Sequence, residues 1–279
     1  MVVFPNCKIN IGLQVGPLRT DGYHHLQTIF YPLPFTDALE IIAAPGKTGI
    51  QFTCSGLAVQ GNESDNLCVQ AYHLLKKDFP QIPAVQMHLH KAIPMGAGLG
   101  GGSADAAFTL SLINKKYQLH LSADQLEQYA LRLGSDCPFF ILNTPCHAWG
   151  RGEEMMPVPL NLSGYNLVLI NPGIHVHTGE AFAALAGKRK NNPDSEQPNL
   201  KVAIMEPPES WKENISNDFE AVIFTKFPSI AAIKKTLYKQ GAVYASMSGS
   251  GSTVYGLFKT IGSLSLSFPP AWLVKTFLL

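Results

Sequence analysis

The chain lacks the features that mark several large classes of protein. No stretch approaches the roughly 18 consecutive apolar residues of a transmembrane helix, so the sequence predicts no membrane span. The formal net charge of +1 argues against a protein that binds nucleic acid through a basic surface. The five cysteines form no C-x-x-C pair and no zinc-like or disulfide-like spacing.

The first residues also lack a targeting signal. "MVVFPNCKINIGL" has no basic start, no long apolar run and no cleavage site. We therefore expect a soluble protein of a reducing compartment, the cytoplasm. With 279 residues, 46% of them hydrophobic and 15% charged, the chain suits one large domain or two intimate ones.

Alternating and helical periods predict a mixed α+β fold. In "KINIGLQV" the residues Ile9, Ile11 and Leu13 share one face of a strand, and Lys8 and Asn10 lie on the other. Further strands are expected at 37–44, 50–56, 85–93, 135–142, 165–173, 242–247 and 253–258. Helices are expected behind the capping candidate Ser64, from Ser103, from the capping box at Ser122 to Gly134, and over 229–241.

The order of these elements divides the chain into two domains, 1–152 and 153–279. The segment 187–201 mixes charge, asparagine and proline without a period, and we expect a mobile surface loop there.

The stretch "PMGAGLGGGSADAA" (94–107) is the strongest functional signal. Its five glycines carry no Cβ and lead into the start of a helix, so their N–H groups and the helix dipole form an anion site suited to phosphates. The Ser103 hydroxyl adds a ligand for a phosphate oxygen or Mg²⁺. The sequence therefore predicts a phosphate cradle.

Two other readings of this stretch stay open. It satisfies G-x-G-x-x-G, which also occurs in plain strand-to-helix turns and in dinucleotide-binding folds. The dinucleotide reading needs an acidic residue about 20 positions further on, and Asp124 has that spacing but falls in the first turn of a helix.

Other candidate residues are ambiguous by themselves. Lys8 is either a solvated edge lysine or a catalytic one, and Asp136 is either a turn cap or a base. Tyr23 and His24 follow a D-G turn and form either an ordinary strand or the wall of a pocket. His88 and His90 have metal-like spacing without a third ligand, so we expect ordinary solvent-side residues.

Three segments together resemble the GHMP small-molecule kinase superfamily. They are "NCKINIGL", the glycine stretch, and the late loop in "SMSGSGSTVYGLF". The combination of "DGYHH", "GLGGGSADAA" and "LGSDCPFF" is most similar to the branch that phosphorylates the 2-hydroxyl of 4-diphosphocytidyl-2-C-methyl-D-erythritol in non-mevalonate isoprenoid biosynthesis. Another GHMP-type alcohol kinase and a catalytically silent GHMP-like sensor are the alternatives.

The resemblance implies a two-domain α+β fold with the active site in the cleft between the domains, and it implies ATP and Mg²⁺. Lys8 and Asp136 would be catalytic. Asn10, Tyr23, His24 and Phe182 would bind the cytidine-diphospho sugar alcohol. The ATP-binding residues would be Pro94, Met95, Gly96, Ala97, Gly98, Leu99, Gly100, Gly101, Gly102, Ser103 and Ala104.

The resemblance leaves the metal site incomplete. Many relatives hold Mg²⁺ with a glutamate, and neither Glu153 nor Glu154 is a clear counterpart. Ser103 is the one metal ligand that we assign from the sequence.

Overall fold

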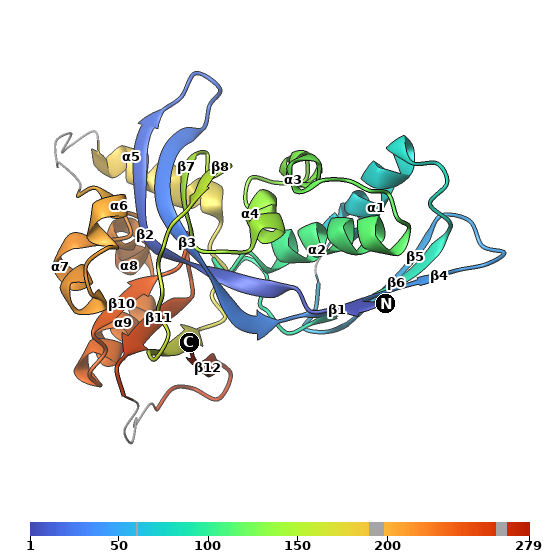
Figure 1. Ribbon diagram of the computed structural model, residues 1–279. Helices are drawn as coiled ribbons and strands as arrows, with labels where there is room; N and C mark the ends of the chain where they lie inside the picture. The colour runs from blue at the N-terminus through green and yellow to red at the C-terminus, as the bar shows by residue number, and fades with distance from the viewer. Residues whose placement is uncertain (60, 190–197, 261–266) are drawn as a thin grey trace. The chain divides into compact units, whose positions relative to one another are not determined.

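The protein is described here from a computed structural model that covers residues 1–59, 61–189, 198–260 and 267–279 (Figure 1). The strands are β1 (Val2–Val3), β2 (Asn6–Leu18), β3 (His24–Thr36), β4 (Ala38–Ala43), β5 (Ile50–Gly56), β6 (Val85–Lys91), β7 (Cys146–Gly150), β8 (Glu154–Pro157), β9 (Asn166–Asn171), β10 (Tyr244–Met247), β11 (Val254–Phe258) and β12 (Leu273–Leu278). The helices are η1 (Glu63–Asp65), α1 (Leu67–Asp78), α2 (Gly101–Lys116), α3 (Ala123–Leu131), α4 (Cys137–Leu142), α5 (Thr178–Arg189), α6 (Leu200–Ala203), η2 (Pro208–Ser210), α7 (Trp211–Asn214), α8 (Glu220–Lys226) and α9 (Pro228–Lys239).

The chain forms two compact units, each built from several segments. The first unit contains Met1–Lys8, Pro32–Met95 and Gly100–Thr144, and the second contains Ile9–Tyr31, Gly96–Leu99 and Pro145–Leu279. The two halves of the glycine stretch therefore belong to different units. The single boundary after residue 152 stays a prediction.

The first unit is a sheet with helices on one face. Its strands run in the order β1-β4-β6-β5, with β5 parallel to β6 and the other pairs antiparallel. In β6 the alternate residues Val85, Met87 and Leu89 are buried, and His88 and His90 on the other face are exposed, as predicted. Figure 1 shows α1, α2 and α3 on the covered side of this sheet.

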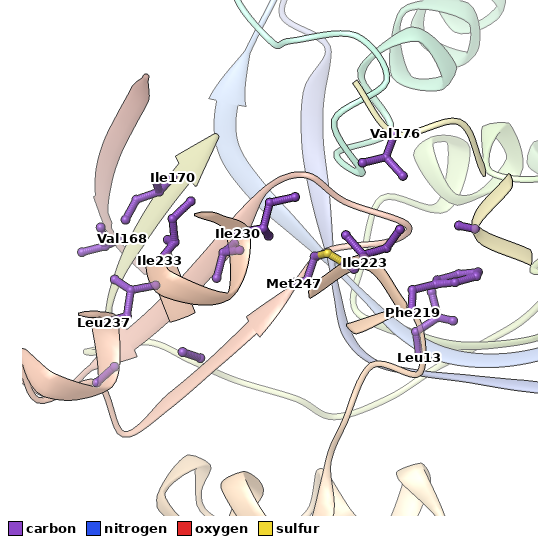
Figure 2. Packing of buried hydrophobic residues seen from close by; sticks show 14 of the residues in the cluster. Leu13, Val168, Ile170, Val176, Phe219, Ile223, Ile230, Ile233, Leu237 and Met247 are labelled. Carbon is purple, nitrogen blue, oxygen red and sulfur yellow. The ribbon is translucent and has the colours of Figure 1, made fainter. Parts of the chain in front are cut away.

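The second unit contains the antiparallel sheet β10-β11-β9-β12. The helices α8 and α9 pack their apolar residues against it, and Val168, Ile170, Ile233 and Leu237 are among the buried side chains of this core (Figure 2). A further sheet has the order β2-β3-β7-β8, and β2 and β3 contribute residues to both units.

Three predictions of local structure are wrong. Residues 137–142 form the helix α4 instead of a strand, because a short apolar run does not distinguish the two and Pro138 in the first turn favours a helix. Asn66, not Ser64, caps α1 by accepting a hydrogen bond from Cys68 N. The helix α2 begins at Gly101, two residues before Ser103, because Gly100 adopts the left-handed conformation at φ +70° and turns the chain into the helix.

The other strands and helices named above are confirmed, including the capping box between Ser122 and Gln125. The predicted loop 187–201 starts too early, since α5 runs to Arg189. Its central residues 190–197 lie outside the described residues. Among the described helices, none combines the length and the apolar character that a bilayer span requires.

A buried histidine, His147, lies in β7 of the second unit. The His147 side chain is 4% exposed, stacks on Trp149 at 5.4 Å, and has no hydrogen-bond partner on either ring nitrogen. Burial, with a smaller contribution from nearby Lys201, lowers the pKa of His147 to about 4. In the unfolded chain a histidine has a pKa of about 6.5. At a pH between the two pKa values, His147 therefore binds a proton in the unfolded chain but not in the folded protein.

We therefore expect the stability of the protein to fall as the pH drops from about 6.5 toward about 4, because unfolding then takes up a proton at His147. Replacing His147 by Phe should flatten this fall in the free energy of unfolding, measured by urea denaturation at about pH 7 and about pH 5. The exposed His73, replaced by Phe, is the control for the loss of a histidine. An unchanged pH dependence in the His147→Phe variant would contradict the assignment.

Candidate functional site

The glycine stretch reaches its shape through three left-handed residues. Gly96, Gly98 and Gly100 have φ values of +62°, +77° and +70°, which side chains with a Cβ adopt only under strain. These glycines alternate with Ala97 and Leu99, whose side chains are buried. The main chain therefore turns tightly just before α2 begins. The backbone N–H groups of such a coil are suited to bind an anion.

Gly100, Gly101 and Gly102 lie in the first unit and have different surroundings. A Cβ on Gly100 would lie 2.9 Å from Phe140 Cζ and 3.2 Å from Lys8 Cε, so this part of the loop contacts the lysine of β2. A Cβ on Gly101 would lie 2.8 Å from Ile93 Cγ2, whereas one on Gly102 would have only Leu67 at 4.0 Å. Gly101 therefore serves close packing, and Gly102 faces open space.

Lys8 and Asp136, predicted as a catalytic pair, lie together in the first unit. The Lys8 Nζ is 3.4 Å from Asp136 Oδ2, and the side chains are 4% and 37% exposed. The lysine is therefore not a solvated edge residue. Asp136 occupies the N-cap position of α4 but makes no capping hydrogen bond with its side chain, so its carboxylate is directed to other contacts.

Ser103 lies in the first turn of α2, close to α4. Its side chain lies near the thiol of Cys137, the residue after Asp136. Burial raises the pKa of Cys137 to about 12, so the thiol stays protonated at neutral pH. The start of α2, which carries Ser103, therefore lies beside the segment that carries Asp136.

A cavity opens in the first unit beside Gly102, and no local sequence pattern predicts it. Both apolar and polar side chains line it. The lining residues are Phe52, Thr53, Cys54, Val59, Gly61, Asn62, Glu63, Asp65, Asn66, Leu67, Leu89, Lys91, Met95, Gly102 and Asp105. Such a mixture of apolar walls and a few polar groups is typical of a small-molecule site.

Two of the lining residues, Lys91 and Asp105, belong to a buried charge network. Lys91 Nζ donates hydrogen bonds to Asp37 and, at 2.7 Å, to Asp105 Oδ2. Asp37 Oδ1 also accepts from the N–H groups of Ala92 and Ile93, the two residues before the loop. Burial raises the pKa of Asp105, and its Oδ1 has no hydrogen-bond partner. The network thus connects the strand before the glycine stretch to the helix after it.

In the second unit the first half of the glycine stretch packs against the late loop Ser248–Ser252. Ser248 Oγ donates to Gly98 O at 2.7 Å, and a Cβ on Gly98 would lie 2.0 Å from Ser248 O. His175 packs its ring against Gly96, where a Cβ would lie 2.6 Å from the imidazole. The late loop, an open question from sequence, is therefore a partner of the glycine stretch.

Asn10 is 2% exposed and belongs to the same cluster. Its backbone N–H donates to Ser248 Oγ at 3.1 Å, and its side-chain Nδ2 donates to Thr28 Oγ1 at 2.9 Å. The tertiary structure thus places Asn10 beside the late loop.

The residues predicted to bind the cytosine ring of the substrate, Tyr23, His24 and Phe182, also lie in the second unit. The rings of His24 and Phe182 stack at 5.3 Å with an interplanar angle of 10°. His24 Nδ1 lies 3.0 Å from Gly16 O and must donate to it, since a carbonyl only accepts. Tyr23 is 54% exposed and stacks instead against the Arg151 guanidinium at 4.8 Å.

The described residues contain no cluster of candidate metal ligands. Among them, no group of three histidine, cysteine or acidic side chains could hold an ion. Glu153 accepts hydrogen bonds from Arg151, through both the backbone N–H and the side chain. Oxygen donors in the described residues near the loop include Ser103, Asp105 and Asp136.

Comparison with known proteins gives a consistent family. Residues 66–144 match the GHMP kinases N terminal domain, and residues 202–263 match the GHMP kinases C terminal domain. The chain is 51% identical over 266 residues to a 4-diphosphocytidyl-2-C-methyl-D-erythritol kinase from Bacteroides thetaiotaomicron, covering 95% of this chain and 94% of that one. It is 50% identical over 259 residues to the kinase of the same name from Bacteroides fragilis, covering 92% of both chains.

A solved structure agrees with these relatives. The crystal structure of a 4-(cytidine 5'-diphospho)-2C-methyl-D-erythritol kinase superposes with a TM-score of 0.78 and 30% identity, over 92% of this chain and 90% of that one. The two-domain α+β fold of the GHMP kinases, expected from the sequence, is thereby confirmed. On the fold, the glycine loop beside Lys8 and Asp136, and identity along nearly the whole length, the chain belongs to the GHMP kinase family, in the branch of the 4-diphosphocytidyl-2-C-methyl-D-erythritol kinases.

Proposed function

We propose that the protein transfers the γ-phosphoryl group of ATP to the 2-hydroxyl of 4-diphosphocytidyl-2-C-methyl-D-erythritol, in non-mevalonate isoprenoid biosynthesis. Similarity to relatives of that name over nearly the whole chain supports the substrate. The observation that carries the chemistry is the position of Gly100 against Lys8, whose ammonium pairs with Asp136. Its place of action in the proposal is the cytoplasm.

ATP binds along the stretch from Pro94 to Ala104 in this proposal. The left-handed glycines and the N-terminus of α2 direct N–H groups at the phosphates, and the open side of Gly102 leaves room for close approach. The adenine base of ATP binds in the cavity beside Gly102, between apolar side chains such as Leu67 and the polar Asn66 and Lys91.

Lys8 and Asp136 act on the attacking hydroxyl. Phosphoryl transfer has a loose transition state, so the protein mainly positions the reactants and stabilises charge on the phosphoryl oxygens. Asp136 orients the 2-hydroxyl and accepts its proton late in the transfer. The adjacent Lys8 ammonium favours the ionised carboxylate and donates a hydrogen bond to the nucleophile or the transferred group.

Mg²⁺ fits this site as an ion held mostly by the triphosphate. When bound, it neutralises charge on the β- and γ-phosphates. The Ser103 hydroxyl and the Asp136 carboxylate are oxygen donors of the kind that Mg²⁺ prefers, and one or two protein ligands beside phosphates and waters are usual for it.

The cytidine end of the substrate binds in the second unit. A centroid distance of 5.3 Å is direct contact, so the pyrimidine takes its place against the His24–Phe182 pair after one ring moves or on a face left exposed. With Nδ1 of His24 donating to Gly16, its Nε2 accepts a hydrogen bond from an exocyclic amine such as that of cytosine. Tyr23 gives a further aromatic wall, and Asn10 orients the sugar alcohol.

The direct test is incubation with ATP, Mg²⁺ and a panel of alcohols that includes the cytidyl intermediate, homoserine and mevalonate, followed by mass analysis for added phosphate. We expect phosphate on the cytidyl compound alone. Phosphorylation of another alcohol would indicate a different GHMP-type activity, and ATP binding without any product would indicate a sensor.

Replacing Asp136 by Asn should lower kcat by about 100-fold or more, because the amide cannot accept the hydroxyl proton. ATP affinity, measured by calorimetry, should change little since the glycine loop is intact. The exposed Asp124 replaced by Asn is the matched control. A near-normal kcat would remove Asp136 from the mechanism.

Replacing Gly102 by Val should weaken ATP binding by about 10-fold or more while the thermal unfolding midpoint stays close to that of the parent, because the new side chain enters open space on the ligand side. Gly101→Val is the contrasting variant. Its side chain would collide with Ile93, so we expect lost stability there. Unaltered ATP affinity in the Gly102 variant would contradict the phosphate cradle.

A further inference from the structure

The segment Asn217–Glu220, "NDFE", lies outside every motif that the sequence analysis singled out. It leads into α8 in the second unit, and Asn217 and Phe219 are both 2% exposed. Its four residues make hydrogen bonds or ring contacts with several parts of that unit.

Asn217 holds the late loop from behind. Its Nδ2 donates to Met247 O and to Gly249 O, both at 2.8 Å, and its Oδ1 accepts from Phe219 N at 3.0 Å. All three hydrogen bonds are buried, so losing them leaves unsatisfied backbone groups in a dry interior. Asn217 therefore fixes the backbone on both sides of Ser248.

The late loop in turn holds the first half of the glycine stretch. Ser248 Oγ donates to Gly98 O, and a Cβ on Gly249 would lie 3.1 Å from Gly98 Cα. Backbones in such close contact cannot shift independently. The position of Gly98 thus depends on Asn217 through a single intervening loop.

Phe219, two residues after Asn217, contacts the aromatic pair formed by His24 and Phe182. Its ring meets that of Phe182 edge-on at 4.9 Å, and Phe182 stacks on His24. Figure 2 shows Phe219 beside Leu13 and near Ile223, in the core that this ring closes. The orientation of Phe182 therefore depends on the ring of Phe219.

Asp218 and Glu220 anchor the segment itself. Asp218 Oδ2 accepts from Val15 N at 2.7 Å, and Asp218 N donates to Leu13 O at 2.9 Å. Glu220 accepts from Met247 N at 2.8 Å and pairs with Lys234 at 2.6 Å. These bonds attach the segment to β2, β10 and α9, so it is a rigid support.

We propose that Asn217 and Phe219 are positioning residues, Asn217 for the ATP-phosphate loop through the Ser248–Gly98 contact and Phe219 for the cytidine-binding rings through Phe182. This proposal rests on the proposed function. One short segment thereby aligns the binding parts for both substrates within the second unit.

The test separates two effects that a merely structural role would not separate. Asn217→Ala should raise the Kd for ATP by about 10-fold, equivalent to the loss of one to two buried hydrogen bonds, with the KM for the cytidyl substrate changed less than about 2-fold. Phe219→Leu should raise the KM for the cytidyl substrate by about 5-fold, with the Kd for ATP unchanged. Asn217→Asp should be worse than Asn217→Ala, because the oxygen that replaces Nδ2 would face the carbonyls of Met247 and Gly249.

Matched controls come from elsewhere in the chain. Asn114 clamps a turn in the same manner, donating to Leu121 O and accepting from Leu121 N, and Ile233 is a core residue of the second unit. Asn114→Ala and Ile233→Val should lower the thermal midpoint without changing either constant. ATP affinity is measured by calorimetry without turnover, and turnover of the cytidyl substrate by the parent protein tests the proposed function separately. Equal changes of both constants in each variant, or none, would overturn the proposal.

Discussion

Close approach of main chain to its surroundings governs this protein from Gly96 to Gly102. Gly98 lies against the carbonyl of Ser248, Gly100 against Phe140 and Gly101 against Ile93, each at a distance that a Cβ would not allow. Gly96, Gly98 and Gly100 also have positive φ values. The loop can adopt this conformation only with glycine at these positions. The backbone N–H groups that would bind phosphate are therefore held in place before a ligand binds.

Buried charge is the second organising feature. Lys8, Lys91, Asp37 and Asp105 are all nearly inaccessible, and burying an ion is costly unless it finds a partner of opposite charge. Lys91 donates hydrogen bonds to Asp37 and Asp105. Asp37 also accepts from the backbone just before the loop, and Asp105 lies in the second turn of α2. Lys8 meets an aspartate that is still partly exposed, so the carboxylate can reach solvent or substrate. The fully buried Lys91 network is suited to a structural role, and the partly exposed Lys8–Asp136 pair is suited to contact with a substrate.

In the second unit neutral groups contact the glycine stretch and the aromatic pair directly, while the carboxylates of Asp218 and Glu220 anchor the segment behind them. Hydrogen bonds of Ser248 and Asn217 hold main chain against main chain, and rings at 4.9 to 5.3 Å from one another hold His24 through Phe182 and Phe219. Geometry of this kind is specific to shape and changes little with salt, unlike contacts between exposed charges.

From the sequence alone one obtains the periodic elements, the glycine stretch and its anion-binding character, because alternation, capping residues and missing side chains are local properties that act wherever they occur. Lys8 and Asp136 were visible as residue types, but whether they meet is a matter of how β2 and α4 pack, and α4 itself was mistaken for a strand. The Lys91 network, the cavity beside Gly102 and the segment at Asn217 left no local signal. Hydrogen-bonded partners in the network are 14 to 56 residues apart in the chain, and Asn217 lies 30 and 32 residues from the two carbonyls of the late loop that it contacts. Tertiary structure decided these, because a buried donor or charge selects its partner by proximity after folding and not by spacing along the chain.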